Sequence, residues 1–159
     1  RELVDGEAVE LGRLTIETFH TPGHSRGSIS LFVVEDRALI TGDAVPVPGE
    51  PPIFEDAAES RNSVECLADL PGVAMLLSSW DEPCRGVREV ARKFEKSLEW
   101  MERVRDMVRR VKDGGGVPEM PDFAGRVLSG LGLSMKMVNP LTTKSLVAEF
   151  VAAQKDGTI

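Results

Sequence analysis

The stretch TFHTPGHSRGSISLF, residues 18–32, constrains the fold most, because a rigid corner interrupts two strand-like runs. The first run ends near His20, Pro22-Gly23 turns the chain, and alternation of polar and apolar residues resumes at Ser28. His24, one of only two histidines in the chain, follows that corner. The stretch therefore predicts two strands joined by a loop that presents an imidazole, and functional groups are commonly carried on such loops.

Other strands are predicted around this corner. Apolar alternation or continuous apolar runs fall at residues 9–20, 28–35, 37–43 and 73–80. A turn at residues 35–37 is expected to join the second and third of these strands as a hairpin, and residues 81–86 are expected to form a turn. Residues 45–56 are rich in proline, which excludes a helix or central strand and predicts an ordered surface loop.

The second half of the chain is predicted to be helical. Apolar residues recur every three or four positions from Val87 to Val111, which predicts a long amphipathic helix ending at Asp113 and the glycines after it. Shorter helices are expected at residues 121–128 and 143–154. A further short helix, capped by Ser60 or Asn62, is expected to run to Leu70, before the last strand. This order of elements predicts an α/β fold.

Composition excludes several classes of protein. The 159 residues are 42% hydrophobic and 28% charged, which fits a compact domain with a core. A net charge of −7 argues against nucleic-acid binding, since a surface that binds phosphates is basic. No apolar run is long enough to cross a membrane, and no signal-peptide core is present. Cys66 and Cys84 form no CxxC pattern, so we expect free thiols and a cytoplasmic protein.

His24 and Asp43 are the residues most suited to chemistry. Each follows a predicted strand, and Gly42 allows the backbone to pass close to whatever Asp43 contacts. An imidazole and a carboxylate form a natural ligand set for zinc, iron or manganese. From the residue pattern alone, a structural role for both in turns stays open.

The segment LTIETFHTPGHSRGSISLFVVEDRALITGDAV resembles the metallo-β-lactamase superfamily, in the region that usually reads HTPGHTxGS followed by TGD. The resemblance is strong over residues 4–45 and looser over residues 46–85. It implies that His24 is a metal ligand and that Asp43 is the catalytic carboxylate, bridging two metal ions. The implied cofactor is zinc, as one or two ions, with iron or manganese as alternatives.

The same resemblance gives roles to the neighbours of His24. His20 matches a position that is often histidine but is not a ligand, so packing or support of the site is implied. Ser25 and Ser28 are implied to fix the loop through hydrogen bonds.

Two departures from the family pattern make the implied site incomplete. The HxHxDH motif that normally precedes this segment is absent. The last histidine of the family usually stands in a pattern such as LLSGHDEP, but here the stretch reads LLSSWDEP and Trp80 takes its place. An indole nitrogen cannot bind a metal, and Asp81 is the candidate substitute ligand. Trp80 is then a pocket residue, and an altered, single-metal site is one expectation.

The resemblance also implies the architecture. Members of the superfamily are αββα sandwiches of two similar halves, so residues 1–86 would be the C-terminal half and residues 87–159 a helical extension packed on it. Half a sandwich exposes an apolar sheet face and an open strand edge. We expect these to be covered by the missing N-terminal half, as a separate or cleaved polypeptide, or by a second copy of the chain in an oligomer.

Three functions follow from these observations. The first is a metal-dependent hydrolase of a small-molecule ester, thioester, lactone, amide or phosphoester, active only if another segment supplies the missing ligands. The second is a non-catalytic binding or assembly protein, which the loss of the last histidine favours. The third is the di-iron oxidoreductase branch of the superfamily, which requires a glutamate in the upstream motif.

Overall fold

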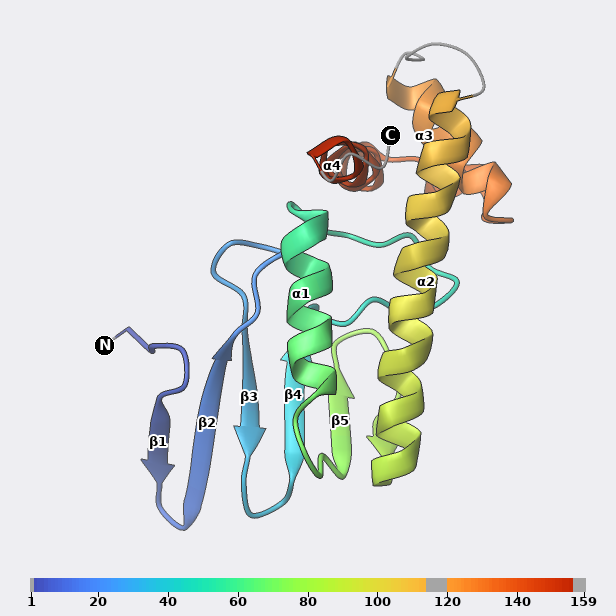
Figure 1. Cartoon of the computed structure of the whole chain (residues 1–159). Helices are drawn as coiled ribbons and strands as arrows, with labels where there is room; N and C mark the ends of the chain where they lie inside the picture. Colours follow the sequence, from blue (N-terminus) through green and yellow to red (C-terminus); the bar gives the residue numbers. More distant parts are fainter. Residues whose placement is uncertain (1, 114–119, 156–159) are drawn as a thin grey trace.

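The computed structural model describes residues 2–113 and 120–155 and shows a six-stranded sheet with helices against one face (Figure 1). The strands are β1 (Ala8–Leu11), β2 (Leu14–His20), β3 (Ile29–Val33), β4 (Ala38–Gly42), β5 (Met75–Ser78) and β6 (Cys84–Arg85). The helices of the described residues are α1 (Ala57–Ala68), α2 (Val87–Asp113), α3 (Met120–Gly130), the 3-10 turn η1 (Met135–Met137) and α4 (Pro140–Lys155). The predicted α/β class is confirmed.

The strands lie in the sheet in the order in which they occur in the chain. All neighbouring strands are antiparallel except β4 and β5, which are parallel. A parallel pair needs a crossover connection, and α1 supplies it, as the helix between β4 and β5. Leu39 of β4 pairs with Phe32 on one side and Leu76 on the other, which places these three side chains on the same face.

Three local predictions were wrong. Residues 9–20 form a hairpin of β1 and β2 and not one strand, because Gly12 adopts a φ of +65° and turns the chain. The N-cap of α1 is Asp56, whose carboxylate accepts from the amides of Ala58 and Glu59, and neither Ser60 nor Asn62 serves as the cap. The expected turn at residues 81–86 contains β6, which pairs with β5.

The long helix was predicted correctly, and α3 and α4 extend somewhat beyond their expected ranges. α2 runs from Val87 to Asp113, while α4 begins at Pro140 and not near Thr143. Asn139 initiates α4, since its side-chain oxygen accepts from the amides of Leu141 and Thr142. The glycines expected to end α2 lie outside the described residues. No helix in the described ranges is long and apolar enough to cross a membrane.

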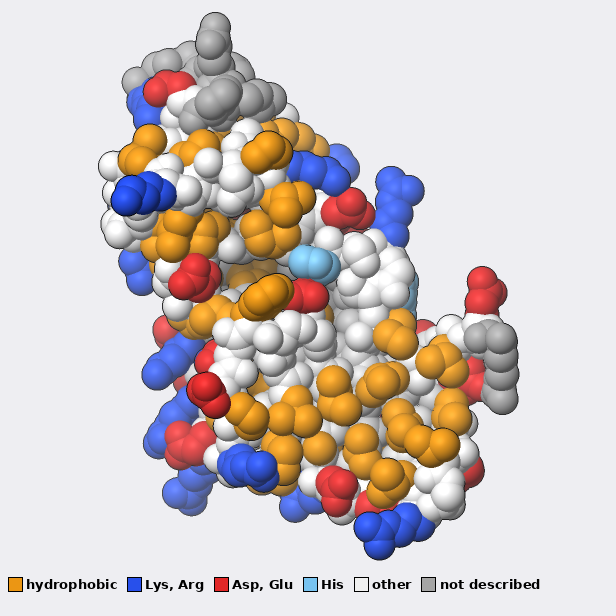
Figure 2. Space-filling model, turned by 180° about the vertical axis from the view of Figure 1, so that it is seen from behind, with side chains coloured by type: hydrophobic (Ala, Val, Ile, Leu, Met, Phe, Trp, Pro, Cys, Tyr) orange, Lys and Arg blue, Asp and Glu red, His pale blue; other side chains and the backbone are white. Residues whose placement is uncertain are grey.

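The two faces of the sheet differ in what covers them. On the covered face, α1 and α2 pack against the strands and form a core with fully buried side chains (Figure 1). This core contains Leu39, Val45, Val64, Leu67, Val73, Leu76, Val90, Phe94 and Met101. The other side, which we call the open face, carries the alternate residues Val9, Ile16, Leu31, Val33, Ile40, Met75 and Leu77. Hydrophobic side chains gather over it in the view from behind (Figure 2).

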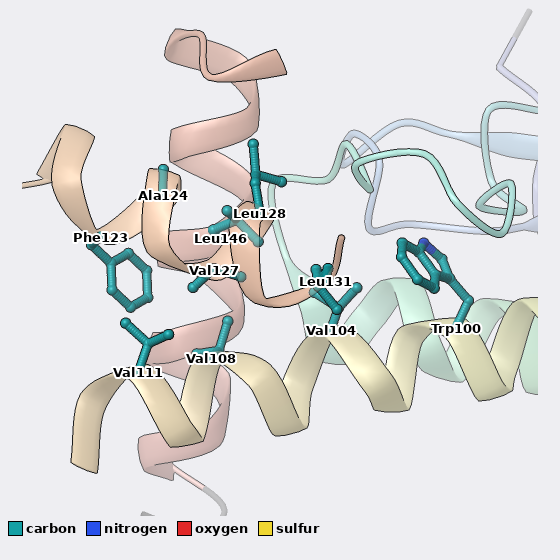
Figure 3. Close-up of a cluster of buried hydrophobic side chains, with 10 residues drawn as sticks. All are labelled: Trp100, Val104, Val108, Val111, Phe123, Ala124, Val127, Leu128, Leu131 and Leu146. Atoms are coloured by element: carbon teal, nitrogen blue, oxygen red, sulfur yellow. The ribbon is translucent and has the colours of Figure 1, made fainter. Parts of the chain in front are cut away.

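A second core joins the helices beyond the sheet. α2 extends past the strands, and α3 and α4 pack on its far half (Figure 3). Val104, Val108, Val127, Leu128 and Leu146 are almost completely buried there. This packing fixes α4 over the end of the sheet that carries His24, since Phe54 donates from its amide to Ser145 of α4 at 3.0 Å.

Candidate functional site

His24 is positioned by a glycine corner that packs against α1. Gly23 has a φ of +128°, and a Cβ at this position would lie 2.3 Å from the Ser60 Cα, so only glycine fits. The Gly23 carbonyl accepts from the amides of Glu55 and Asp56, at 2.7 and 3.1 Å. The loop that carries the imidazole is therefore joined directly to the start of α1.

The hydrogen bond of the His24 ring defines which nitrogen is free. Nδ1 lies 2.9 Å from the Ile53 carbonyl oxygen, which can only accept, so Nδ1 carries the proton and donates. In the neutral ring, Nε2 then keeps its lone pair, and it lies 4.0 Å from Oδ2 of Asp43. A carbonyl partner on the far nitrogen is the usual arrangement of a metal-binding histidine.

Asp43 follows β4 and is held by Trp80. Gly42 has a φ of +54° next to an irregularity in the pairing of β4 with β5, and this turns the chain so that Asp43 approaches His24. The indole Nε1 of Trp80 donates to Oδ1 of Asp43. One carboxylate oxygen is thus occupied by the side chain that stands where the family pattern has a histidine, and the other oxygen is directed at His24.

Asp81 lies apart from His24 and Asp43. Its carboxylate forms an ion pair with Lys93 of α2 and accepts from the amide of Glu82. Burial lowers the pKa of Lys93, whose side chain is part-buried. The ion pair attaches the turn after β5 to α2, and Asp81 is not among the residues that line the pocket at His24.

His20, Ser25 and Ser28 surround the corner without entering the pocket. The His20 ring bonds through Nε2 to the Arg26 carbonyl at 2.9 Å, so it donates there. The hydroxyl groups of Ser25 and Ser28 lie 2.9 Å apart, and the Ser25 amide donates to Ser28 Oγ at 3.2 Å. All three side chains support the loop between β2 and β3.

The proline-rich loop forms one wall of a pocket of about 590 Å³ that contains His24, Asp43 and Trp80. Its backbone is fixed to α2: Ser97 Oγ donates to the Pro46 carbonyl at 2.7 Å, and Trp100 Nε1 donates to the Glu50 carbonyl at 2.9 Å. Trp100 projects from α2 toward this loop (Figure 3). Neither of these α2 residues was predicted to hold the loop, because contacts between residues some fifty positions apart leave no local pattern.

The two candidate ligands fit a metal ion but do not complete its site. Zinc bonds to histidine nitrogen and to carboxylate oxygen are each about 2.0–2.2 Å long. The distance of 4.0 Å between Nε2 of His24 and Oδ2 of Asp43 is no longer than two such bonds placed end to end. A single ion can therefore contact both atoms. Among the described residues, no group of three or more His, Cys, Asp or Glu side chains could hold a metal. A catalytic zinc site uses about three protein ligands, so this chain provides part of one.

Comparison with known proteins identifies the family. The family model of the metallo-beta-lactamase superfamily matches residues 1–80. Two curated relatives match most of the chain: a hydroxyacylglutathione hydrolase-like protein of Homo sapiens, 30% identical over 82% of it, and a beta-lactamase-like protein 2 homolog of Caenorhabditis elegans, 28% identical over 73% of it. The hydroxyacylglutathione hydrolase of Rhizobium etli is 35% identical over 45% of the chain.

Solved structures show the same fold. A metallo-beta-lactamase family protein from Thermus thermophilus superposes over 98% of the chain with a TM-score of 0.75 at 18% identity. A beta-lactamase domain protein from Burkholderia ambifaria covers 99% with a TM-score of 0.71 at 20% identity. The chain spans only 49% and 46% of these two structures, and 49%, 38% and 28% of the human, nematode and Rhizobium relatives. It therefore corresponds to about half of a larger fold.

Proposed function

The chain belongs to the metallo-beta-lactamase superfamily, and we propose that it is the metal-binding C-terminal half of a hydrolase. The observation that carries this proposal is the pair His24 and Asp43, with Nε2 and Oδ2 facing each other at 4.0 Å in a pocket. The superfamily is generally metal-dependent, often on zinc, and several matching relatives are named as hydrolases. Substrates of the proposed reaction are small esters, thioesters, lactones, amides or phosphoesters.

In this proposal, the residues of the chain hold and orient the site. His24 presents a free Nε2 because the Ile53 carbonyl binds the other nitrogen. Asp43 contributes one carboxylate oxygen, while Trp80 holds the other. A bound metal ion supplies Lewis acidity to such a site. The loop of residues 45–54 shields one side of the pocket from water, and its attachment to α2 keeps this wall in place when a substrate binds.

The open face supports the proposal that another polypeptide segment completes the fold. The apolar residues of this face include Ile40, which is 38% exposed, and Leu11 at the sheet edge is 62% exposed. Because the relatives are at least twice as long as the part matched here, we propose that their remaining half, or a second copy of this chain, covers this face and brings the missing ligands. Both cysteines are free, which supports a reducing compartment such as the cytoplasm.

A non-catalytic binding protein is the second candidate, and Trp80 favours it. This residue stands where the family pattern has a histidine, and its indole bonds to Asp43. An indole donates a hydrogen bond and does not ligate metals. If the site has lost its metal, the hydrogen bond to Trp80 takes over the role of holding Asp43 in place.

Metal content per chain separates the two candidates. The protein is purified without added metal or chelator and measured by elemental mass spectrometry, beside His24→Ala and Asp43→Asn. If a second copy of the chain supplies the missing ligands, we expect about one ion of zinc, iron or manganese per chain in the unmodified protein and loss of most of it in both variants, since each removes a ligand. His20→Ala is the matched control. The Nε2 of His20 bonds to the Arg26 carbonyl and His20 does not line the pocket, so its loss should leave the metal content unchanged.

Three other results of the metal measurement would contradict the proposal or change it. Metal far below one ion per chain, and not restored by dialysis against zinc, would exclude the hydrolase for this chain and favour the binding protein. Iron in place of zinc would favour the di-iron branch of the superfamily. Equal loss of metal in His20→Ala and His24→Ala would contradict the assignment of His24 as the ligand and of His20 as a residue that only supports the loop.

A further inference from the structure

The pocket at His24 is apolar over most of its wall. Its side chains come from four separate parts of the chain: the loop between β2 and β3, the loop after β4, the turn after β5, and the first turn of α4. The apolar residues that form most of the wall are Val45, Val47, Pro51, Ile53, Trp80 and Leu141. A volume of about 590 Å³ is in the range of pockets that bind small molecules.

Three of these apolar side chains are exposed at the pocket. Trp80 is 82% exposed, Leu141 is 63% exposed and Ile53 is 37% exposed, although they belong to segments far apart in the sequence. Isolated exposed apolar residues are common on proteins, but here three of them line one cavity. A ligand with an apolar part would remove all three from water at once.

The charged side chains that line the pocket are both acidic. Asp43 and Glu50 provide carboxylates, and none of the lining residues is a lysine or an arginine. Lys144, on the same helix as Leu141, pairs with Glu55 at 3.0 Å in a neighbouring groove. In the metal-free chain, a ligand that carries a negative charge beside its apolar part would therefore meet repulsion without a compensating cation.

The wall is also fixed before any ligand arrives. The carbonyl groups of Pro46 and Glu50 accept from Ser97 and Trp100 of α2, and the amide of Phe54 donates to Ser145 of α4. Proline residues restrict the same loop further. A fixed wall lowers the entropic cost of binding, because the loop does not need to be ordered by the ligand.

We propose that this pocket binds the uncharged, apolar acyl group of the substrate, against Trp80, Ile53 and Leu141, and that Glu50, together with Asp43 in the metal-free chain, discriminates against anionic ligands. The proposal names the substrate class for the hydrolase proposed above and in that respect rests on it. The binding itself needs no metal. It can therefore be tested separately from the reaction.

The test is a titration of the metal-free chain, in the presence of a chelator, with hexanamide and with hexanoate at pH 8. The two ligands share the same alkyl chain and differ in charge. Trp80 reports binding by its fluorescence, since it is exposed, whereas Trp100 is 3% exposed and lies outside the pocket lining. We expect a blue shift and a hexanamide dissociation constant in the millimolar range or below, about tenfold lower than that of hexanoate.

Variants make the test specific. Glu50→Gln should bring hexanoate binding closer to that of hexanamide, while Glu65→Gln, an exposed glutamate on α1, should leave the ratio unchanged. Leu141→Ser should weaken hexanamide binding several-fold, measured by calorimetry as well as fluorescence. Trp80→Phe should abolish the fluorescence change but keep most of the calorimetric binding.

The outcomes distinguish this proposal from the proposed hydrolase. Absence of hexanamide binding, or hexanoate binding as tight as that of hexanamide, would overturn the assignment of the pocket even if the chain binds metal. Hexanamide binding with the expected preference, in a chain that takes up no metal, would support the pocket and contradict the hydrolase.

Discussion

The two faces of the sheet have similar apolar residues but opposite environments. Leu39 and Ile40 are consecutive in β4, yet Leu39 is completely buried under the helices while Ile40 is 38% exposed on the open face. Side chains alternate between faces along a strand, so the difference comes from what lies opposite and not from residue type. The helices of this chain cover one face of the sheet, whereas the other face stays part-exposed, and we propose that a partner outside this chain covers it.

The largest expected effect tests this contrast directly. Leu39→Ala should lower the free energy of unfolding by about 3 kcal/mol, because it leaves a cavity in the core. Ile40→Ala, the next residue, should cost about 1 kcal/mol or less, since less apolar surface is buried there. Urea denaturation of both variants measures the difference. Similar losses in both would mean that the open face is already covered in solution.

Much of the sheet could be predicted from sequence, because strands and the long helix leave local patterns. The alternation in residues 28–35 predicted β3, and the spacing of apolar residues predicted α2 over nearly its full length. The hairpin of β1 and β2 was missed because Gly12-Arg13 interrupts a run that still alternates on both sides. Asp56 was missed as the cap of α1 because serine and asparagine a few residues later are equally good caps.

The site was harder to predict than the fold. The sequence indicated His24 and Asp43 as the candidate pair, and the structure places them 4.0 Å apart between Nε2 and Oδ2. No sequence pattern indicated that Trp80 donates to Asp43, that Asp81 pairs with Lys93 of α2, or that Trp100 holds the loop. These contacts depend on tertiary packing between distant segments, and no periodicity or local motif encodes them.

A smaller effect is expected from the cap that anchors α1 on the covered face. Asp56→Ala removes the acceptor for the amides of Ala58 and Glu59 and should cost about 1 kcal/mol of unfolding free energy. Asp69→Ala, at the other end of the same helix, is the matched control and should be neutral or slightly stabilising, since a carboxylate is unfavourable near a helix C-terminus. Denaturant titration compares the two, and a loss in Asp69→Ala equal to that in Asp56→Ala would show that the cap is not the cause.

The smallest effect on the free energy of unfolding is expected from a charged residue on the open face. Its main effect should be on the self-association of the chain. Ile40→Lys should change the free energy of unfolding by only about 0.5 kcal/mol, because the position is part-exposed and a lysine stem can lie along the sheet. A charge in the centre of an apolar face is costly to bury in an interface, so the variant should sediment as a monomer at concentrations where the unmodified chain self-associates.

Val151→Lys provides the control for association, since Val151 is 41% exposed on α4 and lies away from the sheet. Analytical ultracentrifugation over a range of concentrations should show self-association of this variant and of the unmodified chain alike. If the unmodified chain remains monomeric at every concentration, then a second copy is not what covers the open face. We propose that the remaining half of the fold, seen in the longer relatives, is then what covers this surface.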